Sequence, residues 1–420
     1  MSDSRFEADY WMETAIDPRK AAEFMAGEQS SGTFVAVPGE TEELKARSAA
    51  RVTRLEILDD RVPAPSLPSA GLEVAPGRFL TRALVTLSWP LDTIGPSLPN
   101  LIATVAGNLF ELKPITGLKL LDIRLPSAFA EAHAGPKFGI EGTRRLTGVE
   151  RRPLIGTIIK PSVGFDAAET AALVDQLCRA GIDFIKDDEL QSDGPGCPFE
   201  DRVKAVMRVV EAHADRSGRK VMFAFNLTGD LDQMRRRHDI LLAHGATCLM
   251  ASLNSVGLVG MLELARFAEL PIHAHRNGWG ALSRHPALGW SYVAWQKIWR
   301  LAGVDHMHVN GLRNKFAETD DSVLASARAC LTPLFPDKPC TVMPVFSSGQ
   351  SAAQVPGTWA GLKSTDLIFA AGGGIMAHPH GPAAGVTALH EAWEATLAGV
   401  PLADHARAHP NLALALGAAA

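Results

Sequence analysis

The chain has 420 residues, of which 46% are hydrophobic and 21% are charged, and its formal net charge is −5. This composition is typical of a globular protein with a large core. It shows neither the basic run of a nucleic-acid-binding protein nor the ~18 uninterrupted apolar residues of a membrane span. The five cysteines are dispersed without a CxxC pair, and the N-terminus is acidic and polar. These features predict reduced thiols and a cytoplasmic protein.

Residues 1–130 predict one small α+β domain. Strands are expected near residues 6–14, 33–37, 51–58, 78–89 and 118–125, and helices near 18–26 and 97–109. Strands and helices interleaved in this order favour an antiparallel sheet with helices on one face. Residues 128–153 are expected to be a linker.

From residue 154 onward, short β-prone runs alternate with helical patterns, which indicates βα units and a parallel sheet. Eight strands are expected to start near Leu154, Asp183, Lys220, Cys248, Pro271, Asp305, Cys340 and Leu367. Eight units in this length predict a closed (β/α)8 barrel over residues 140–410, and a doubly wound open sheet is the alternative.

The most informative stretch is Gly181–Glu189, an apolar run that ends in one lysine and three carboxylates. Side chains alternate along a strand, so Lys186 and Asp188 share a face, and Glu189 joins them only if the backbone turns. Such oxygen-rich clusters suit Mg²⁺. A protonated lysine would repel the ion, whereas a lysine that has reacted with CO2 offers a carbamate. The alternative is an ordinary ion pair at a strand end.

Other polar or glycine residues follow the predicted strands, where a barrel places its active site. The motif Gly372–Gly374, with Ser348 and Gly349 nearby, is typical of a loop whose backbone N–H groups bind phosphate. Arg276, next to His275, can grip a second anionic group. Lys160 is a candidate acid or base, and Lys315 lies in a loop that can close over substrate.

Together these motifs resemble the large subunit of ribulose-bisphosphate carboxylase (RuBisCO), in the same order and at similar spacing. The matching segments are Glu28–Phe34, Gly107–Phe110, Thr157–Pro161, Gly181–Glu189, His273–Arg276, Asp305–His308 with Lys315, Ser347–Gly349 and Gly372–Pro379. The resemblance implies a ferredoxin-like N-terminal domain on a (β/α)8 barrel. It also implies a homodimer with sites shared between subunits.

The resemblance implies a role for each matching residue. Lys186 would be the carbamylated lysine, with Asp188 and Glu189 as Mg²⁺ co-ligands, and Lys160, His275 and Lys315 would be catalytic. The residues implied to bind a phosphorylated substrate are Glu28, Thr33 and Asn108 from the partner subunit, Arg276 and His308 at one anionic end, Gly349, Gly372 and Gly373 at the other, and also Ser347.

Several positions depart from the family pattern. Ser162 replaces a lysine, Trp279 replaces the third histidine, Phe34 replaces a tryptophan, and Ser348 replaces a glycine. The chain is therefore expected to be a RuBisCO-like protein that does not fix CO2.

Lys315 is retained, and in carboxylation the corresponding lysine faces the newly formed carboxylate. A substrate that already carries a carboxylate beside a ketone is therefore expected. The leading hypothesis is an Mg²⁺-dependent lyase that forms an enediolate by removing CO2 from 3-oxo-isoapionate 4-phosphate.

Three alternatives stay open at this point. One is a hydrolase that cleaves a C–C bond of the same acid into two acids. Another is an enolase or isomerase of a methylthio-sugar phosphate, although such enolases carry a lysine where this chain has Asn108. The third is a non-catalytic protein that keeps the barrel fold without its enzymatic activity. The presence of all three predicted metal ligands disfavours this alternative.

Overall fold

The structure is a computed structural model that describes residues 4–32, 37–70 and 77–417. The strand expected near 33–37 lies largely outside the described residues. The chain divides into two compact units: residues 1–134 with 278–301, and residues 135–277 with 302–420.

The first unit contains a five-stranded sheet in the order β10-β4-β1-β3-β2. Its elements are β1 (Arg5–Thr14), α1 (Pro18–Glu28), α2 (Glu42–Ser48), β2 (Arg51–Val62), β3 (Leu80–Pro90), α3 (Leu98–Ala106), β4 (Ile115–Arg124), α4 (Ala128–Ala132), α10 (Trp279–Ser283), β10 (Leu288–Trp290) and α11 (Tyr292–Leu301). The β-α-β-β-α-β order of β1 to β4 confirms the predicted ferredoxin-like domain.

One part of this unit differs from the prediction. Residues 290–301 have the pattern of a barrel helix in the sequence and contain α11, but α11 packs against β4 of the first unit, and the short strand β10 before it pairs with β4 in parallel. The sheet is therefore mixed rather than wholly antiparallel. β10 is only partly buried, so it lacks the apolar run that marks the equally short but fully buried strands β6, β11 and β13 in the sequence.

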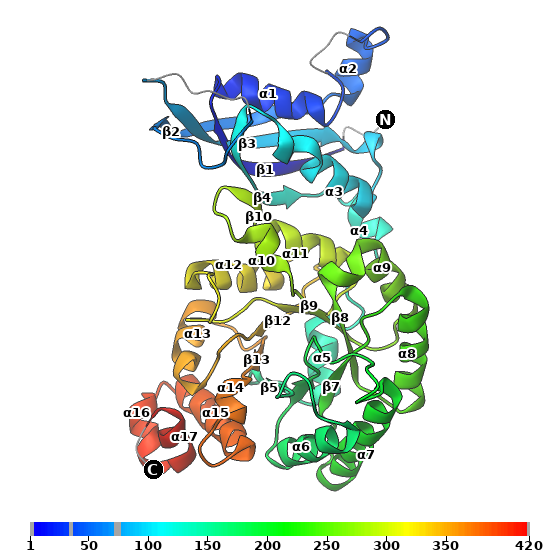
Figure 1. Cartoon of the computed structure of the whole chain (residues 1–420), viewed down its shortest axis with the longest axis vertical. Helices are drawn as coiled ribbons and strands as arrows, with labels where there is room; N and C mark the ends of the chain where they lie inside the picture. The colour runs from blue at the N-terminus through cyan, green and yellow to red at the C-terminus, as the bar shows by residue number, and fades with distance from the viewer. Residues whose placement is uncertain (1–3, 33–36, 71–76, 418–420) are drawn as a thin grey trace. The chain divides into compact units, whose positions relative to one another are not determined.

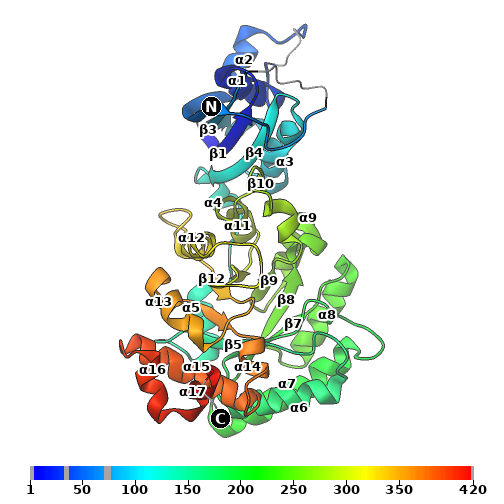
Figure 2. The ribbon, with the colours of Figure 1, turned by 60° about the vertical axis from the view of Figure 1, so that its left-hand side comes forward.

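The second unit is a closed barrel in the order β11-β12-β13-β5-β6-β7-β8-β9, with every neighbouring pair parallel (Figures 1 and 2). Its strands are β5 (Leu154–Ile158), β6 (Phe184–Lys186), β7 (Met222–Asn226), β8 (Cys248–Ser252), β9 (Ile272–His275), β11 (His306–His308), β12 (Met343–Phe346) and β13 (Ile368–Ala370). The eight predicted strands all exist, and the predicted (β/α)8 barrel is confirmed.

Helices surround these strands. They are α5 (Gly139–Thr147), α6 (Ala167–Arg179), α7 (Phe199–Ser217), α8 (Leu231–Ala243), α9 (Leu253–Phe267), α12 (Asp320–Leu331), α13 (Val355–Leu362), α14 (Gly373–Met376), α15 (Pro382–Leu397), α16 (Leu402–His405) and α17 (Pro410–Ala415). Two helices start with capping boxes, Asp166 with Glu169 and Asp230 with Gln233, so their first N–H groups are satisfied. The segment expected to be a linker contains α4 and α5.

Apolar side chains fill the barrel. The buried cluster includes Leu154, Phe184, Met222, Met250 and Val345. This packing fixes the strands relative to one another and so holds the loops at their ends in place.

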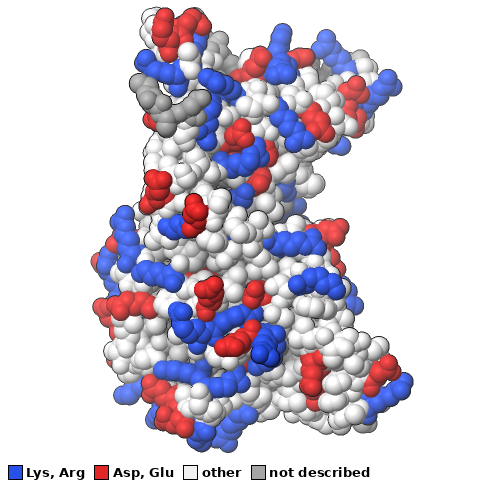
Figure 3. All heavy atoms as spheres, turned by 180° about the vertical axis from the view of Figure 1, so that it is seen from behind, with Lys and Arg blue, Asp and Glu red and all other residues white. Residues whose placement is uncertain are grey.

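The surface carries both signs of charge. On the face seen in Figure 3, basic and acidic side chains are interspersed over the second unit. Among the described residues, no helix combines the length and apolar character needed to cross a bilayer.

Candidate active site

Parallel strands in a closed barrel all end at the same edge, so the residues that follow them are neighbours. The predicted site residues of the second unit lie at or after these ends: Lys160 after β5; Lys186, Asp188 and Glu189 at and after β6; His275 and Arg276 at and after β9; His308 on β11; Lys315 between β11 and α12; Ser347 and Gly349 after β12; and Gly372 and Gly373 after β13.

Lys186 is buried at the end of β6, with 1% of its surface exposed. Its Nζ donates to the carbonyl of Asp187 at 2.7 Å and lies 3.4 Å from Oε2 of Glu189. Burial lowers the pKa of Lys186 because the charged form loses its hydration. A neutral amine is the form that can attack CO2, so this environment favours the carbamate that the sequence predicts.

Asp187 points away from this cluster, as strand alternation requires. Its Oδ2 accepts hydrogen bonds from Arg202 on α7 at 3.1 and 3.2 Å and from the backbone N–H of Asn226 at 2.9 Å. Both Asp187 and Arg202 are fully buried. Of the three consecutive carboxylates, this one is therefore structural.

Asp188 is in contact with the lysine of the neighbouring strand. Nζ of Lys160 lies 2.5 Å from Oδ2 of Asp188 and 2.7 Å from Oγ of Ser162. The backbone N–H of Leu190 donates to the other carboxylate oxygen. Ser162, which stands where the family has a second lysine, thus orients Lys160.

Glu189 is joined to the cluster by a turn of the backbone after β6, as the sequence analysis required. Its Oε2 lies 3.3 Å from Nε2 of His275. Burial raises the pKa of Glu189, but at the acidic pH at which this carboxylate titrates, His275 and Lys186 are protonated and lower the pKa more, to about 2. Burial lowers the pKa of His275 to about 4. We therefore expect an ionised carboxylate beside a neutral imidazole at pH 7.

Neutral histidines continue along the next strands. Nε2 of His273 lies 2.8 Å from Nε2 of His308, and Nδ1 of His308 lies 2.9 Å from Oγ of Ser347. Burial lowers the pKa of both rings well below the ordinary value. In the contact between the two rings, one must donate and the other accept. The hydrogen bonds to His273 and Ser347 therefore fix the orientation of His308 without adding positive charge.

The loop that carries Lys315 lies against the end of β12. The backbone N–H of Lys315 donates to the carbonyl of Ser348 at 3.2 Å, and the Lys315 side chain is exposed. Ser348 and Gly349 have φ angles of 70° and 88°. Gly349 meets this left-handed requirement without strain.

The glycine motif after β13 leads into the four-residue helix α14, which precedes the longer helix α15. A side chain at Gly374 would collide with the backbone of Gln350 and Ser351, so glycine is required there for close packing. Gly373 faces open space. The predicted phosphate site requires such open space, so that an anion can approach the backbone N–H groups.

Two predicted residues lie in the first unit. Nδ2 of Asn108 donates to Oε1 of Glu28 at 3.0 Å. Thr33 lies outside the described residues. The assignment of these three residues to substrate binding stays a prediction.

The cluster at β6 fits a divalent cation only with the carbamate. Among the described residues, no three His, Cys, Asp or Glu side chains are grouped so that they could hold a metal ion. Asp188 and Glu189 supply two acidic groups, and a carbamate on Lys186, whose Nζ lies 3.4 Å from Glu189, would supply the third. Three oxygen ligands of this kind suit Mg²⁺.

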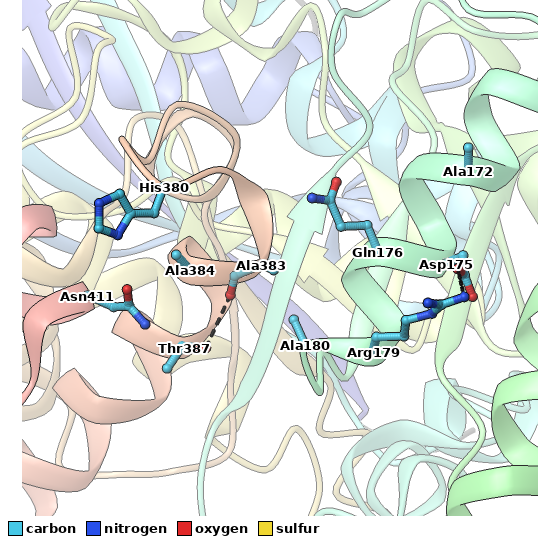
Figure 4. A pocket seen from close by; sticks show the side chains of 10 residues that line it. All are labelled: Ala172, Asp175, Gln176, Arg179, Ala180, His380, Ala383, Ala384, Thr387 and Asn411. Carbon is cyan, nitrogen blue, oxygen red and sulfur yellow. Dashed lines mark hydrogen bonds and ion pairs between the residues drawn. The ribbon is translucent and has the colours of Figure 1, made fainter.

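A cavity of about 550 Å³ lies elsewhere in the second unit, between α6 and α15 (Figure 4). Its polar wall includes Gln176, His380 and Asn411, while Arg179 points to Asp175 at 2.6 Å. None of the predicted site residues lines it, so it is separate from the candidate active site.

The sequence analysis missed several residues of the site. Glu318 forms an ion pair with Arg276, and Arg202 fixes Asp187. Glu318 lies only three residues after Lys315, but nothing in the spacing of residues indicates that a loop carboxylate reaches the end of β9.

A parallel barrel with a buried lysine and two acidic neighbours, in one chain with a ferredoxin-like domain, defines the class of protein. Residues 139–418 match the catalytic domain of the ribulose bisphosphate carboxylase large chain, and residues 6–129 match its N-terminal domain. The chain belongs to the RuBisCO large-chain family.

The comparisons also connect the chain with particular relatives. It is 60% identical over 98% of its length to a 3-oxo-isoapionate-4-phosphate transcarboxylase/hydrolase of Xanthobacter autotrophicus, 99% of which is covered. It is 46% identical over 97% of its length to a 3-oxo-isoapionate-4-phosphate decarboxylase of Rhizobium rhizogenes, 96% of which is covered. The crystal structure of a rubisco-like protein from Burkholderia fungorum superimposes with a TM-score of 0.92 at 51% identity and 99% coverage of both chains.

Proposed function

We propose that the protein is a RuBisCO-like enzyme that acts on 3-oxo-isoapionate 4-phosphate and breaks the bond between its carboxylate carbon and the adjacent carbon. The main support is the lysine–carboxylate cluster at the end of β6 together with Lys315, fixed beside β12. Both curated relatives described above are named for this substrate.

The chemistry follows from the position of the ketone. When the bond to the carboxylate breaks, its electrons move toward the ketone and leave CO2 and an enediolate. A magnesium ion held by the carbamate of Lys186, Asp188 and Glu189 would supply Lewis-acid stabilisation of the negative charge on these oxygens. Lys315 would orient the carboxylate, and Lys160, held by Asp188 and Ser162, would donate a proton to the enediolate carbon.

The fate of the CO2 separates two reactions. If it leaves, the enediolate takes a proton and the enzyme is a decarboxylase, which is the leading hypothesis from the sequence. If it adds to the other enediolate carbon, water can then cleave the new 3-oxo acid into two acids. The name of the relative at 60% identity favours this second reaction.

Isotopic labelling of the substrate carboxylate distinguishes the two reactions. In the presence of Mg²⁺ and bicarbonate, NMR would detect the label as CO2 and bicarbonate for a decarboxylase, or in a carboxylate of one of two acid products for a transcarboxylase/hydrolase. If the substrate remains intact, the proposal is wrong. Solvent deuterium entering 5-methylthioribulose 1-phosphate would instead favour an enolase.

The role of Lys315 has a test of its own. Replacing Lys315 with Met should lower kcat/KM for cleavage by about 10²-fold because the carboxylate is no longer oriented. Lys315→Arg keeps the positive charge and should retain more activity. Equal activity of the Met variant and the unaltered protein would remove Lys315 from the mechanism.

We propose further that the enzyme is a homodimer in which Glu28 and Asn108 complete the site of the partner subunit. A Glu28→Gln variant and a Lys186→Met variant should each be inactive. Mixed dimers, formed by refolding the two together, should recover activity because one site per dimer is intact. Failure of the mixture to recover activity, with dimers verified by light scattering, would show that the sites are not shared.

A further inference from the structure

A buried ion pair occupies the end of the site near β9. Nη2 of Arg276 lies 2.6 Å from Oε2 of Glu318, and the two side chains are only 8% and 16% exposed. Arg276 directly follows β9, and Glu318 directly precedes the N-cap of α12. The pair therefore joins the end of a barrel strand to the loop that carries Lys315.

Further hydrogen bonds hold the Glu318 carboxylate in place. Nδ2 of Asn310 donates to Oε2 at 2.7 Å, and Oγ of Ser322 donates to Oε1 at 2.9 Å. Oδ1 of Asn310 in turn accepts from Oγ of Ser348 at 2.9 Å. A carboxylate with partners on both oxygens is held in a fixed position, in contrast to the carboxylate of an exposed surface ion pair.

The ion pair offsets the charge that Arg276 would offer to a ligand. The buried histidines nearby, His273 and His308, add no positive charge, because burial keeps them neutral. A phosphate dianion at Arg276 would lie close to the Glu318 carboxylate, whose like charge would repel it. The opposite side of the site, at the ends of β12 and β13, presents the uncharged residues Gly349, Gly372 and Gly373.

We propose that Glu318 is a specificity-determining residue that restricts the substrate to a monophosphate. The phosphate binds at the glycine-rich ends of β12 and β13, and an uncharged, hydroxyl-bearing end of the substrate faces Arg276. This inference rests on the proposed function and deepens it by naming the residue that excludes a second phosphate. It revises the expectation that Arg276 and His308 grip an anionic group.

Ligand binding tests the inference without turnover. Ribitol 5-phosphate and ribitol 1,5-bisphosphate lack a carbonyl group and cannot react, so calorimetry can compare their affinities for the intact enzyme loaded with Mg²⁺ and bicarbonate. The unaltered enzyme should bind the monophosphate at least as tightly as the bisphosphate. Glu318→Gln removes the negative charge and should tighten bisphosphate binding roughly tenfold or more relative to the monophosphate.

Two further variants separate charge from loop geometry. Ser322→Ala removes a hydrogen bond to Glu318 but keeps its charge, so the preference for the monophosphate should not change. Glu318→Ala should shift the preference in the same direction as Glu318→Gln, and circular dichroism should verify that each variant is folded. An unchanged affinity ratio in both Glu318 variants, or no bisphosphate binding by either, would overturn the inference.

The proposed reaction and the proposed role of Glu318 can each be refuted without the other. Cleavage of 3-oxo-isoapionate 4-phosphate with an unaltered affinity ratio in the variants would refute only the role of Glu318. A shifted ratio without cleavage of that acid would refute the proposed substrate and leave the charge-based selection intact.

Discussion

The Nζ atom of Lys160 lies 2.5 Å from Oδ2 of Asp188, and this contact joins the ends of β5 and β6. The two strands are neighbours in the barrel, with Ile158 in register with Lys186. A candidate proton donor is thereby held next to a candidate metal ligand. Two of the four predictions below concern this cluster, one concerns the buried pair of Asp187 with Arg202, and one concerns Glu13 in the first unit.

Replacing Lys160 with Met should lower kcat by about 10²-fold or more, because a positioned acid or base contributes 10²–10⁴-fold. Substrate binding should change much less. Steady-state kinetics with labelled substrate measure both. Ser162→Ala, which removes only one hydrogen bond to Lys160, should lower kcat by a factor less than a tenth as large. A Met variant that keeps half the activity would exclude Lys160 as the proton donor.

Magnesium binding should depend on bicarbonate, because the third acidic ligand forms only when Lys186 reacts with CO2. Calorimetry should detect Mg²⁺ uptake by the unaltered protein with bicarbonate and little uptake without it. The Lys186→Met variant should bind weakly under both conditions, whereas the variant of an exposed lysine, Lys204→Met, should behave like the unaltered protein. Equal uptake with and without bicarbonate would argue against a carbamate.

Arg202→Ala should destabilise the barrel by about 3–5 kcal/mol, because it leaves the Asp187 carboxylate buried without its partner. Urea unfolding followed by circular dichroism measures this difference. Arg236, which is two-thirds exposed and pairs with Asp193, supplies the control. Arg236→Ala should cost below about 1 kcal/mol. Comparable losses for the two variants would contradict the structural role of Asp187.

Glu13 should make the first unit sensitive to acid. Burial raises the pKa of Glu13, but hydrogen bonds from Ser66, Arg82 and Thr116 outweigh burial, so the pKa is lowered overall. A lowered pKa means that the folded state binds fewer protons. The resulting stability is present above the pKa of the unfolded carboxyl group, about 4.3, and is lost as pH falls through the folded value.

The variant Glu13→Gln should therefore lose about 1–3 kcal/mol at pH 7 and little at pH 3. Urea unfolding between pH 3 and 7 tests this pattern. Glu7→Gln, which affects a partly exposed pair with Arg124, should lose much less at either pH. If the Glu13 variant loses the same stability at every pH, the shape of the Glu13 side chain rather than its charge is responsible.

The sequence by itself determined the eight βα units and the residues at the strand ends, and its resemblance to the RuBisCO large chain implied the ferredoxin-like domain. Helical and strand periodicities are local, and apolar runs followed by polar residues mark where each strand ends. The alternation along Phe184–Asp188 also placed Lys186 and Asp188 on one side, with Asp187 on the other.

Only the tertiary structure decided which side chains meet. The pairing of β10 with β4, the contact of Arg202 with Asp187, and the ion pair of Arg276 with Glu318 each join residues from separate elements. Loop paths and side-chain directions depend on packing, so they leave no periodic pattern in the sequence. For the same reason, the charge that a ligand meets at Arg276 follows from where Glu318 lies in space.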